Sequence, residues 1–251
     1  MLKPRLIPCL LLDDQRLVKT NRFENPKYVG DPINTVRIFN EKEVDEIMII
    51  DIGATKKGED INFELIESIS SECFMPLAYG GGIKSEEDAF RLFELGVEKV
   101  VLQNAFYNNP NLITKITSRF GQQSVVVSID IRKNWRSKVR PYIAHKKKTI
   151  KNETIEQLMQ KAAELGAGEI ILQLVHRDGT KLGADLSSLP SCLKTFELPI
   201  IVAGGTSSLE DVKQYLSIGA NAVAAGAFFV FQGPYNAVLI NYPKYDGLEL
   251  I

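Results

Sequence analysis

The chain has 251 residues, of which 45% are hydrophobic and 24% charged, and its formal net charge is −1. This is the composition of a globular protein with enough chain for a large core. The near-neutral charge argues against a general nucleic-acid-binding protein. No apolar run approaches the ~18 residues of a membrane span, and Pro8 interrupts the N-terminal apolar run, which argues against a signal peptide. We therefore predict a cytoplasmic protein that binds neither membrane nor nucleic acid.

Few side chains suit metal or redox chemistry. The three cysteines, Cys9, Cys73 and Cys192, are widely spaced and form no CxxC pair, which argues against a disulfide framework or a zinc site and fits a reducing compartment. The two histidines, His145 and His176, lie far apart in the sequence, which argues against a histidine metal cluster or a Ser-His-Asp triad. We expect no metal ion and no cofactor.

Short apolar runs alternate with amphipathic segments along the whole chain. We predict eight strands, over residues 5–11, 46–51, 74–79, 99–103, 124–130, 169–174, 199–203 and 222–226. Helix start signals open four of the segments between them: Asp31-Pro32, Ser85 with Asp88, Asn109-Pro110, and Ser208 with Asp211.

A strand followed by a helical segment, repeated eight times, is typical of a closed parallel barrel. We predict a single (β/α)8 barrel domain over residues 1–251, with a doubly wound open sheet as the alternative. The last unit is the weakest, because residues 235–247 support only a short helix. No Pro- or Ser-rich linker divides the chain, which favours one domain.

The second half of the chain repeats the first. When Gly81 is placed on Gly204, the segments GGIKSEEDAFRLFELGVEKVV and GGTSSLEDVKQYLSIGANAVA align without a gap, an offset of 123. An offset of 119 places Leu11 on Asp130. All βα units look somewhat alike, but an ungapped match of this length predicts two fused (β/α)4 halves, at approximately residues 1–120 and 121–251.

Each half contains a glycine-rich turn between a strand and a helix, YGGGIKS at 79–85 and AGGTSS at 203–208. Each half also has a second small or polar turn, LQNAF at 102–106 and AAGAFF at 224–229. Glycines let the backbone approach an anion closely, and helix N-terminal amides bind it. Two hypotheses stay open: a substrate with phosphate at both ends, or turns that are only structural.

Three acids lie at or just beyond predicted strand ends, where barrels place catalytic carboxylates: Asp51, Asp130 and Asp178. Asp51 could instead cap a loop. Asp130 follows four apolar or small residues, and a buried acid of this kind is harder to explain without a function.

Seven segments together resemble the cyclase subunit of imidazole glycerol phosphate synthase over essentially the whole chain: RLIPCL, DPINTVRIFNEKEVDEIMIIDI, YGGGI, NPNLITKITSRFGQQSVVVSIDIRK, ELGAGEIIL, HRDGTKLGAD and LPIIVAGGTSS. The resemblance implies a (β/α)8 barrel that forms a heterodimer with a HisH-like glutaminase subunit and receives ammonia through the barrel centre. It implies a lyase that makes imidazole glycerol phosphate and an aminoimidazole carboxamide ribotide, with aspartates on the first and fifth strands as general acid and base.

The resemblance assigns roles to individual residues. It places catalysis on Asp130, Lys19 and Asp178. It places substrate and phosphate binding on the glycine-rich and polar turns, at Gly81, Gly82, Gln103, Asn104, Gly179, Gly204, Gly205, Gly226 and Ala227. It places a salt-bridged ammonia gate at the bottom of the barrel, for which a plain stabilising ion-pair network is the alternative, at Arg5, Glu46, Lys99 and Glu169.

The sequence departs from the family at the reaction site. The first-strand aspartate is Leu11, which can neither accept nor donate a proton. An Asn-Thr pair, a Thr-Ser pair and two serines of the family are also replaced, by Gln103-Asn104, Gln173-Leu174, and Ala203 and Ala227. The ammonia gate is retained while the rim is altered, which implies a changed substrate.

PCLLL followed by FENPKYVGDPINTVRIFNEKEVDE most resembles a divergent branch of the family, the cyclase-like proteins of surface-polysaccharide pathways. With a glutaminase and a separate amidotransferase, these are implicated in converting an acetamido group of a sugar to acetamidino. The loop at 131–151 holds nine Lys or Arg and no acid, which would suit a phosphorylated or nucleotide-sugar substrate. A solvated hairpin is the alternative for this loop.

Three functional hypotheses follow. The first is an ammonia-channelling enzyme that acts on a sugar-linked substrate with Asp130 as its remaining acid or base. The second is a histidine-pathway cyclase in which Asp13 or Asp14 replaces the missing acid; Asp13 shares the strand parity of Leu11 and lies about 7 Å further along. The third is a non-catalytic scaffold that binds the glutaminase and passes ammonia to a third protein.

Overall fold

The computed structural model describes residues 3–233 and 235–243. Eight parallel strands close into a barrel in the order β1–β4–β5–β6–β7–β10–β11–β12, and β12 pairs back to β1. This confirms the predicted closed barrel and excludes the open sheet. The barrel strands are β1 (Arg5–Asp13), β4 (Ile47–Asp51), β5 (Leu77–Gly80), β6 (Lys99–Leu102), β7 (Val125–Lys133), β10 (Glu169–Leu174), β11 (Ile200–Ala203) and β12 (Ala222–Ala225).

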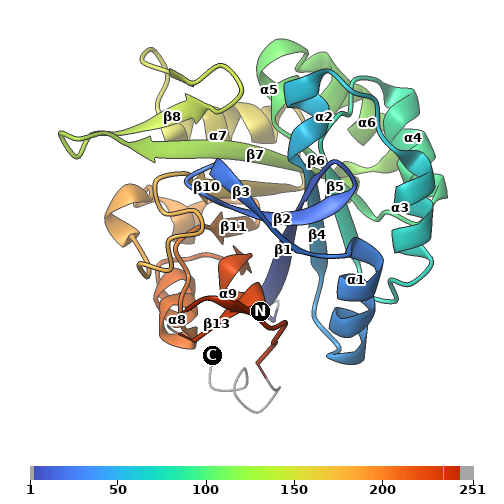
Figure 1. Ribbon diagram of the computed structural model, residues 1–251. Coiled ribbons are helices and arrows are strands. Elements are labelled where there is room, and N and C mark those ends of the chain that lie inside the picture. The colour runs from blue at the N-terminus through green and yellow to red at the C-terminus, as the bar shows by residue number, and fades with distance from the viewer. Residues whose placement is uncertain (1–2, 234, 244–251) are drawn as a thin grey trace.

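Helices surround the barrel and cover its outer face (Figure 1). None of those in the described part of the chain is long and apolar enough to cross a membrane. They are α1 (Pro32–Glu41), α2 (Ile52–Lys57), α3 (Phe63–Ser70), α4 (Glu86–Glu94), α5 (Asn104–Asn108), α6 (Asn111–Phe120), α7 (Ile155–Glu164), α8 (Leu209–Ser217) and α9 (Ala227–Val230). Three single 3₁₀ turns complete the set, η1 (Gln122–Ser124), η2 (Leu186–Ser188) and η3 (Leu193–Thr195).

The predicted helix starts are present. Asp31 caps α1 through its side chain, and Ser85 and Ser208 form capping boxes at α4 and α8. At α6 the N-cap position is Pro110, which makes no side-chain cap bond.

Two of the eight predicted helical segments differ from expectation. Between β10 and β11 the chain forms only η2 and η3, because Gly179, Gly183 and Pro190 interrupt any longer helix. After β12 the helix α9 is short and is followed by an antiparallel pair, β13 (Phe231–Gln232) and β14 (Ala237–Val238).

The prediction of a short helix within residues 235–247 is wrong for residues 235–243, which are not helical. Residues 244–247 lie outside the described residues. Tertiary contacts decide this segment. The Tyr242 hydroxyl donates to the Leu6 carbonyl at 2.9 Å, and the Tyr242 ring stacks on Phe229 with centroids 5.5 Å apart. Pro243 also disfavours a helical conformation at the residue before it.

Two hairpins extend from the carboxyl ends of the barrel strands. The first consists of β2 (Arg16–Asn21) and β3 (Glu24–Gly30), and β2 also pairs with the end of β1. The second consists of the end of β7, β8 (Val139–Ile143) and β9 (Lys148–Thr149), and it projects from the barrel in Figure 1. The basic loop predicted at 131–151 is therefore a hairpin, and most of its charged residues are exposed.

The core has two layers. The larger one packs the helices against the outer face of the strands. The smaller one fills the barrel interior with apolar side chains, several of them alanine, at Ile7, Met48, Ala78, Val101, Val126, Ile171, Ile201, Ala203, Ala222 and Ala224. The interior between the two ends of the barrel is thus mainly apolar, with Ser128 as a polar side chain on the interior face of β7 between Val126 and Asp130.

The internal repeat is visible in the backbone. Gly81 and Gly204, paired by the repeat, have φ angles of +111° and +107°, and Gly82 and Gly205 have φ angles of +72° and +90°. Both turns lead into a helix with a Ser/Asp capping box. The two halves therefore build the same strand–turn–helix geometry on opposite sides of the barrel.

Replacing Gly81 with alanine should destabilise the protein strongly. A Cβ at this position would lie 2.2 Å from the Asp51 carbonyl oxygen, in addition to the cost of the positive φ. We expect the free energy of unfolding in urea to fall by about 2–4 kcal/mol. Gly58→Ala is the matched control, because Gly58 has φ +73° but no atom within 4 Å of a new Cβ, and it should cost about 1 kcal/mol. An equal loss of unfolding free energy in both variants would show that close packing of the turn is unimportant.

Candidate functional site

Asp130 lies at the carboxyl end of the barrel, inside the ring of strands. It sits on β7 opposite Gln173 of β10 and is only 1% exposed. Its Oδ2 atom accepts no hydrogen bond from the described residues. Burial raises the pKa of Asp130 to about 7, although a hydrogen bond from Gln103 lowers it, and the Asp178 carboxylate raises it further. Asp130 can therefore both bind and release a proton near neutral pH.

Leu11 occupies the interior position on β1. Side chains alternate along a strand, so Leu11 shares its face with Ile7 and Cys9, which contact the interior cluster. In the sheet it lies opposite Ile50 of β4. The interior position at this end of β1 is therefore occupied by hydrocarbon and not by a carboxylate.

Asp13 and Asp14 are engaged elsewhere. The Lys57 Nζ atom lies 2.8 Å from Asp13 Oδ1 and also bonds the Asp14 carboxylate. The Asp14 side chain is 72% exposed. Both acids are thus tied to α2 at the rim, which weakens the hypothesis that either replaces the missing acid.

A buried ion pair lies beside Asp130. Lys19 Nζ donates to Asp178 Oδ1 at 2.8 Å, and Thr20 Oγ1 donates to Asp178 Oδ2 at the same distance. The backbone N–H of Arg22 donates to the Asp178 carbonyl at 2.8 Å. These bonds fasten the β2–β3 hairpin to the loop after β10. The sequence analysis did not assign Thr20 to the site. The polar pair Lys19-Thr20 next to the apolar pair Leu17-Val18 was the sequence feature that could have indicated it.

Cys9 lies against this ion pair. Burial raises the pKa of its thiol to about 12, Lys19 lowers it and Asp178 raises it. The thiol is therefore neutral near pH 7 and serves as a small apolar group. The sequence analysis gave Cys9 no site role.

The residues expected to bind phosphate form two groups on opposite sides of the barrel mouth. Gly81, Gly82, Gln103 and Asn104 follow the neighbouring strands β5 and β6, whereas Gly204, Gly205, Gly226 and Ala227 follow β11 and β12. Gly179 lies apart from both, in the loop after β10. The short helices α5 and α9 begin within these groups, and neither has a side-chain cap bond.

Packing accounts for several of the glycines. A Cβ at Gly179 would lie 2.0 Å from the Thr20 carbonyl, and one at Gly226 would lie 3.1 Å from the Lys19 side chain. A Cβ at Gly204 would lie 2.7 Å from the Leu174 carbonyl. These glycines allow close backbone and hairpin contacts whether or not a phosphate binds.

Asp51 is a helix cap. Its Oδ1 accepts from the backbone N–H groups of Gly53 and Ala54, both at 2.9 Å. Burial raises its pKa, while these two hydrogen bonds lower it. The capping alternative considered for Asp51 is confirmed.

The four charges predicted at the opposite end of the barrel form a closed ring of ion pairs. Arg5 lies 2.5 Å from Glu46 and 3.1 Å from Glu169, and Lys99 lies 2.9 Å and 3.3 Å from the same two acids. Burial lowers the pKa of Arg5, but Glu46 and Glu169 raise it above its ordinary value. One oxygen of each glutamate, Glu46 Oε1 and Glu169 Oε2, is buried and accepts no hydrogen bond from the described residues.

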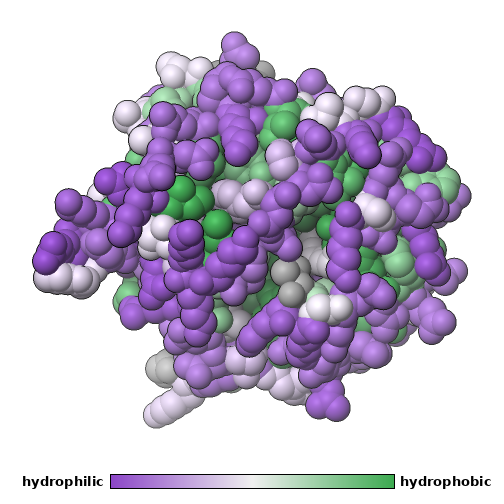
Figure 2. Space-filling model, turned by 90° about the horizontal axis from the view of Figure 1, so that it is seen from above, coloured by the Kyte–Doolittle hydropathy of each residue, from purple (hydrophilic) through white to green (hydrophobic). Residues whose placement is uncertain are grey.

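In the part of the chain that the structure describes, no group of three or more His, Cys, Asp or Glu residues is arranged to hold a metal ion. Figure 2 looks onto the carboxyl-end face and shows mainly hydrophilic side chains, with hydrophobic residues visible between them. A closed parallel barrel with polar and titratable side chains at this end has the architecture of a (β/α)8-barrel enzyme.

The chain belongs to the histidine biosynthesis protein family, whose model matches residues 5–235. A Leptospira borgpetersenii protein provisionally named imidazole glycerol phosphate synthase subunit HisF is 46% identical over 100% of this chain and 99% of its own length. A Pseudomonas aeruginosa protein provisionally named subunit hisF2 is 44% identical over 100% of both chains. The imidazole glycerol phosphate synthase subunit HisF of Exiguobacterium sibiricum is 35% identical over 91% of both.

Asp130 should make the protein less stable as the pH rises. Its folded-state pKa of about 7 lies above the ordinary value of 3.8, so the folded protein binds more protons between these values. Stability contributed by the protonated group is therefore lost between about pH 4 and pH 7. As the pH rises from about 5 to 8, the unfolding free energy of the unmodified protein should therefore fall by about 3 kcal/mol relative to that of Asp130→Asn, which has no carboxylate to titrate here.

Urea unfolding at several pH values measures this difference. Glu24→Gln is the control, because it also removes one carboxylate but from the exposed strand β3. A constant difference between Asp130→Asn and the unmodified protein across this pH range would contradict the raised pKa.

Proposed function

We propose that this protein is the barrel subunit of a glutamine-dependent enzyme, that it receives ammonia from a HisH-like glutaminase subunit, and that it uses the ammonia to amidinate a sugar. The observation that carries the proposal is the contrast between the two ends of the barrel. The ring of Arg5, Glu46, Lys99 and Glu169 is complete, whereas Leu11 stands where the resemblance implies the acid of the cyclase reaction.

The ion-pair ring would form the ammonia entrance. Its four side chains come from the N-terminal ends of strands around the barrel, where a docked glutaminase would meet them. The two unpaired oxygens, Glu46 Oε1 and Glu169 Oε2, offer acceptors for the N–H groups of ammonia. Relatives named as subunits of a synthase support a partner protein for this chain.

The barrel interior would suit neutral ammonia. Its wall is mainly apolar, with small side chains such as Ala78, Ala222 and Ala224. An apolar wall penalises ammonium far more than ammonia, because a charge loses more free energy on leaving water. Nitrogen that enters at the ring would therefore reach Asp130 in its nucleophilic form.

Asp130, Lys19 and Asp178 would form the reaction site. With a pKa of about 7, Asp130 could act as general base or general acid in successive steps. Lys19, held by Asp178, would present a fixed positive charge to an anionic group of the substrate. Asp178 would act by positioning Lys19.

Substrate phosphate would bind on the two sides of the barrel mouth. Amides at the glycine turns and the side chains of Gln103 and Asn104 are the donors on one side, and the turns at Gly204 and Gly226 are those on the other. The close packing of these glycines is a competing explanation for their presence.

Conversion of an acetamido group to acetamidino replaces the amide oxygen by nitrogen from ammonia and releases water. In the proposed function this replacement takes place in the barrel, with ammonia from the glutaminase, and a separate amidotransferase is a further component of the same conversion. Two other functions compete with this one. A histidine-pathway cyclase would require Asp13 or Asp14, which are bound by Lys57. A non-catalytic ammonia carrier would need the ring but not Asp130.

The glutaminase should bind at the ion-pair ring. We expect the barrel and its cognate glutaminase to associate at micromolar concentration or below. Lys99→Ala should weaken association about tenfold or more, because docking would further bury two carboxylates that retain only Arg5 as partner. Sedimentation of mixtures measures this. Lys138→Ala, in the exposed hairpin at the other end of the barrel, should bind normally. No association of the unmodified protein would contradict the proposal.

Asp130→Asn should abolish product formation with either nitrogen source. The assay reconstitutes barrel, glutaminase and amidotransferase and follows the amidino sugar, first with glutamine and then with ammonium salt. Loss of a positioned proton-transfer group should cost ~10²–10⁴-fold. If the barrel were only an ammonia carrier, Asp130→Asn would still support product formation from glutamine, and free ammonium would make the barrel unnecessary.

The unmodified barrel should form only traces of imidazole glycerol phosphate from the family's ribonucleotide substrate and ammonium salt, because Leu11 cannot transfer a proton. A turnover assay measures this, and normal turnover would establish a cyclase.

A further inference from the structure

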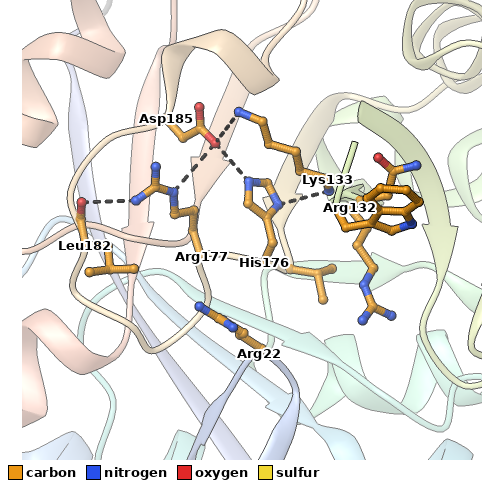
Figure 3. Close-up of a pocket in the computed structure, with 10 residues that line it drawn as sticks. Arg22, Arg132, Lys133, His176, Arg177, Leu182 and Asp185 are labelled. Carbon is orange, nitrogen blue, oxygen red and sulfur yellow. Dashed lines mark hydrogen bonds and ion pairs between the residues drawn. The ribbon is translucent and has the colours of Figure 1, made fainter. Parts of the chain in front are cut away.

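A pocket of about 430 Å³ lies beside the barrel mouth, outside the residues assigned to the reaction site. Three segments enclose it: the β7–β8 hairpin, the loop after β10, and the turn between β2 and β3 (Figure 3). Its volume falls in the range of small-molecule sites. None of the catalytic, phosphate-binding or gate residues that the resemblance assigned lines it, although four of its lining residues belong to the basic loop at 131–151.

Positive charge dominates this pocket. Among the described residues that line it, four are cations, Arg22, Arg132, Lys133 and Arg177, and one is an acid, Asp185. The pocket therefore attracts an anion.

Asp185 organises one wall. Its Oδ2 atom lies 2.9 Å from His176 Nε2, 3.7 Å from Lys133 and 3.6 Å from Arg177. Burial raises the pKa of Asp185, but hydrogen bonds from Ser187, His176 and a second serine, together with Lys133, hold it below its ordinary value. The carboxylate is ionised, and its charge is used to fix the neighbouring side chains, as Figure 3 shows.

His176 is oriented in the same way. Its Nδ1 atom accepts from the Lys133 backbone N–H at 3.3 Å, so Nε2 carries the proton that Asp185 accepts. The wall is thus formed before any ligand binds.

Two guanidinium groups remain without a carboxylate. Arg22 makes no side-chain hydrogen bond or ion pair with the described residues. Arg132 donates to the uncharged Tyr142 hydroxyl at 2.9 Å. In the view of Figure 3, both guanidinium groups lie below His176, whereas Asp185 lies above it. Guanidinium pairs fit the oxygens of phosphate and diphosphate groups.

An aromatic platform adjoins these cations. Trp135 lines the pocket, and 85% of it is exposed. The Arg136 guanidinium lies 4.4 Å from the centre of its ring. An indole that remains so exposed to water can stack on a planar ring, as aromatic side chains do with nucleobases.

The pocket is continuous in sequence with the reaction site. Arg177 directly precedes Asp178, and Arg22 follows the hairpin residues Lys19 and Thr20 that bond Asp178. The pocket and the reaction site are therefore built from neighbouring residues of the same two segments.

We propose that this pocket binds the nucleoside diphosphate part of the substrate, with the diphosphate on Arg22 and Arg132 and the base on Trp135. The inference deepens the proposed function and rests on it for the identity of the reacting sugar. Binding of the nucleotide part requires neither the glutaminase nor the amidotransferase.

Fluorescence gives a direct test, because Trp135 is the single tryptophan of the chain. Titration of the full-length barrel with UDP or ADP should change its emission saturably, and inorganic pyrophosphate should compete. Uridine should bind much more weakly. Arg22→Ala and Arg132→Ala should each weaken nucleoside diphosphate binding about tenfold. Lys27→Ala is the matched control, because Lys27 is exposed on the same hairpin as Arg22 but does not line the pocket, and it should bind normally.

Calorimetry separates the stacking contribution. Trp135→Ala should weaken UDP binding about tenfold and leave pyrophosphate binding unchanged. Equal losses in Lys27→Ala and Arg22→Ala, or no saturable binding of UDP and ADP, would overturn the proposal. Because glutaminase association is measured separately, absent nucleotide binding with intact association would overturn the pocket alone.

Discussion

The buried ion pair between Lys19 and Asp178 determines how the carboxyl-end face is built. Each charge would be costly alone, so the two groups must stay together. Their bond holds the β2–β3 hairpin against the loop after β10. Gly179 is required there because a Cβ would collide with the Thr20 carbonyl of the hairpin, and Gly226 leaves room for the Lys19 side chain. The position of Arg22 at the neighbouring pocket follows from the same contact.

The two ends of the barrel have different constraints. At the N-terminal end, Arg5 and Lys99 each contact both glutamates, so losing any member leaves a buried charge with fewer partners. At the carboxyl end, Leu11 is a half-buried hydrocarbon side chain opposite Ile50 and carries no charge that needs a partner. A barrel can change its reaction by substitutions at this rim without disturbing the strands below it.

The glycine-rich turns show why a motif alone does not establish phosphate binding. Gly81 and Gly204 match across the internal repeat in sequence and in φ, yet each also has a backbone carbonyl where a Cβ would lie. Packing of the turn on the preceding strand is enough to require glycine. The pocket at Arg22, Arg132 and Trp135, by contrast, holds two guanidinium groups that pair with no carboxylate of the described residues, and an exposed indole.

The sequence by itself determined the eight strands, the starts of α1, α4 and α8, and the barrel, because apolar periodicity and capping are local and the repeat fixes the order of units. It also indicated the charged ring and the buried Asp130. Only the tertiary structure decided that Thr20 supports Asp178, that Tyr242 anchors a segment expected to be helical, and that one cationic pocket joins three distant segments. These features depend on contacts between residues far apart in the chain, which no local pattern encodes.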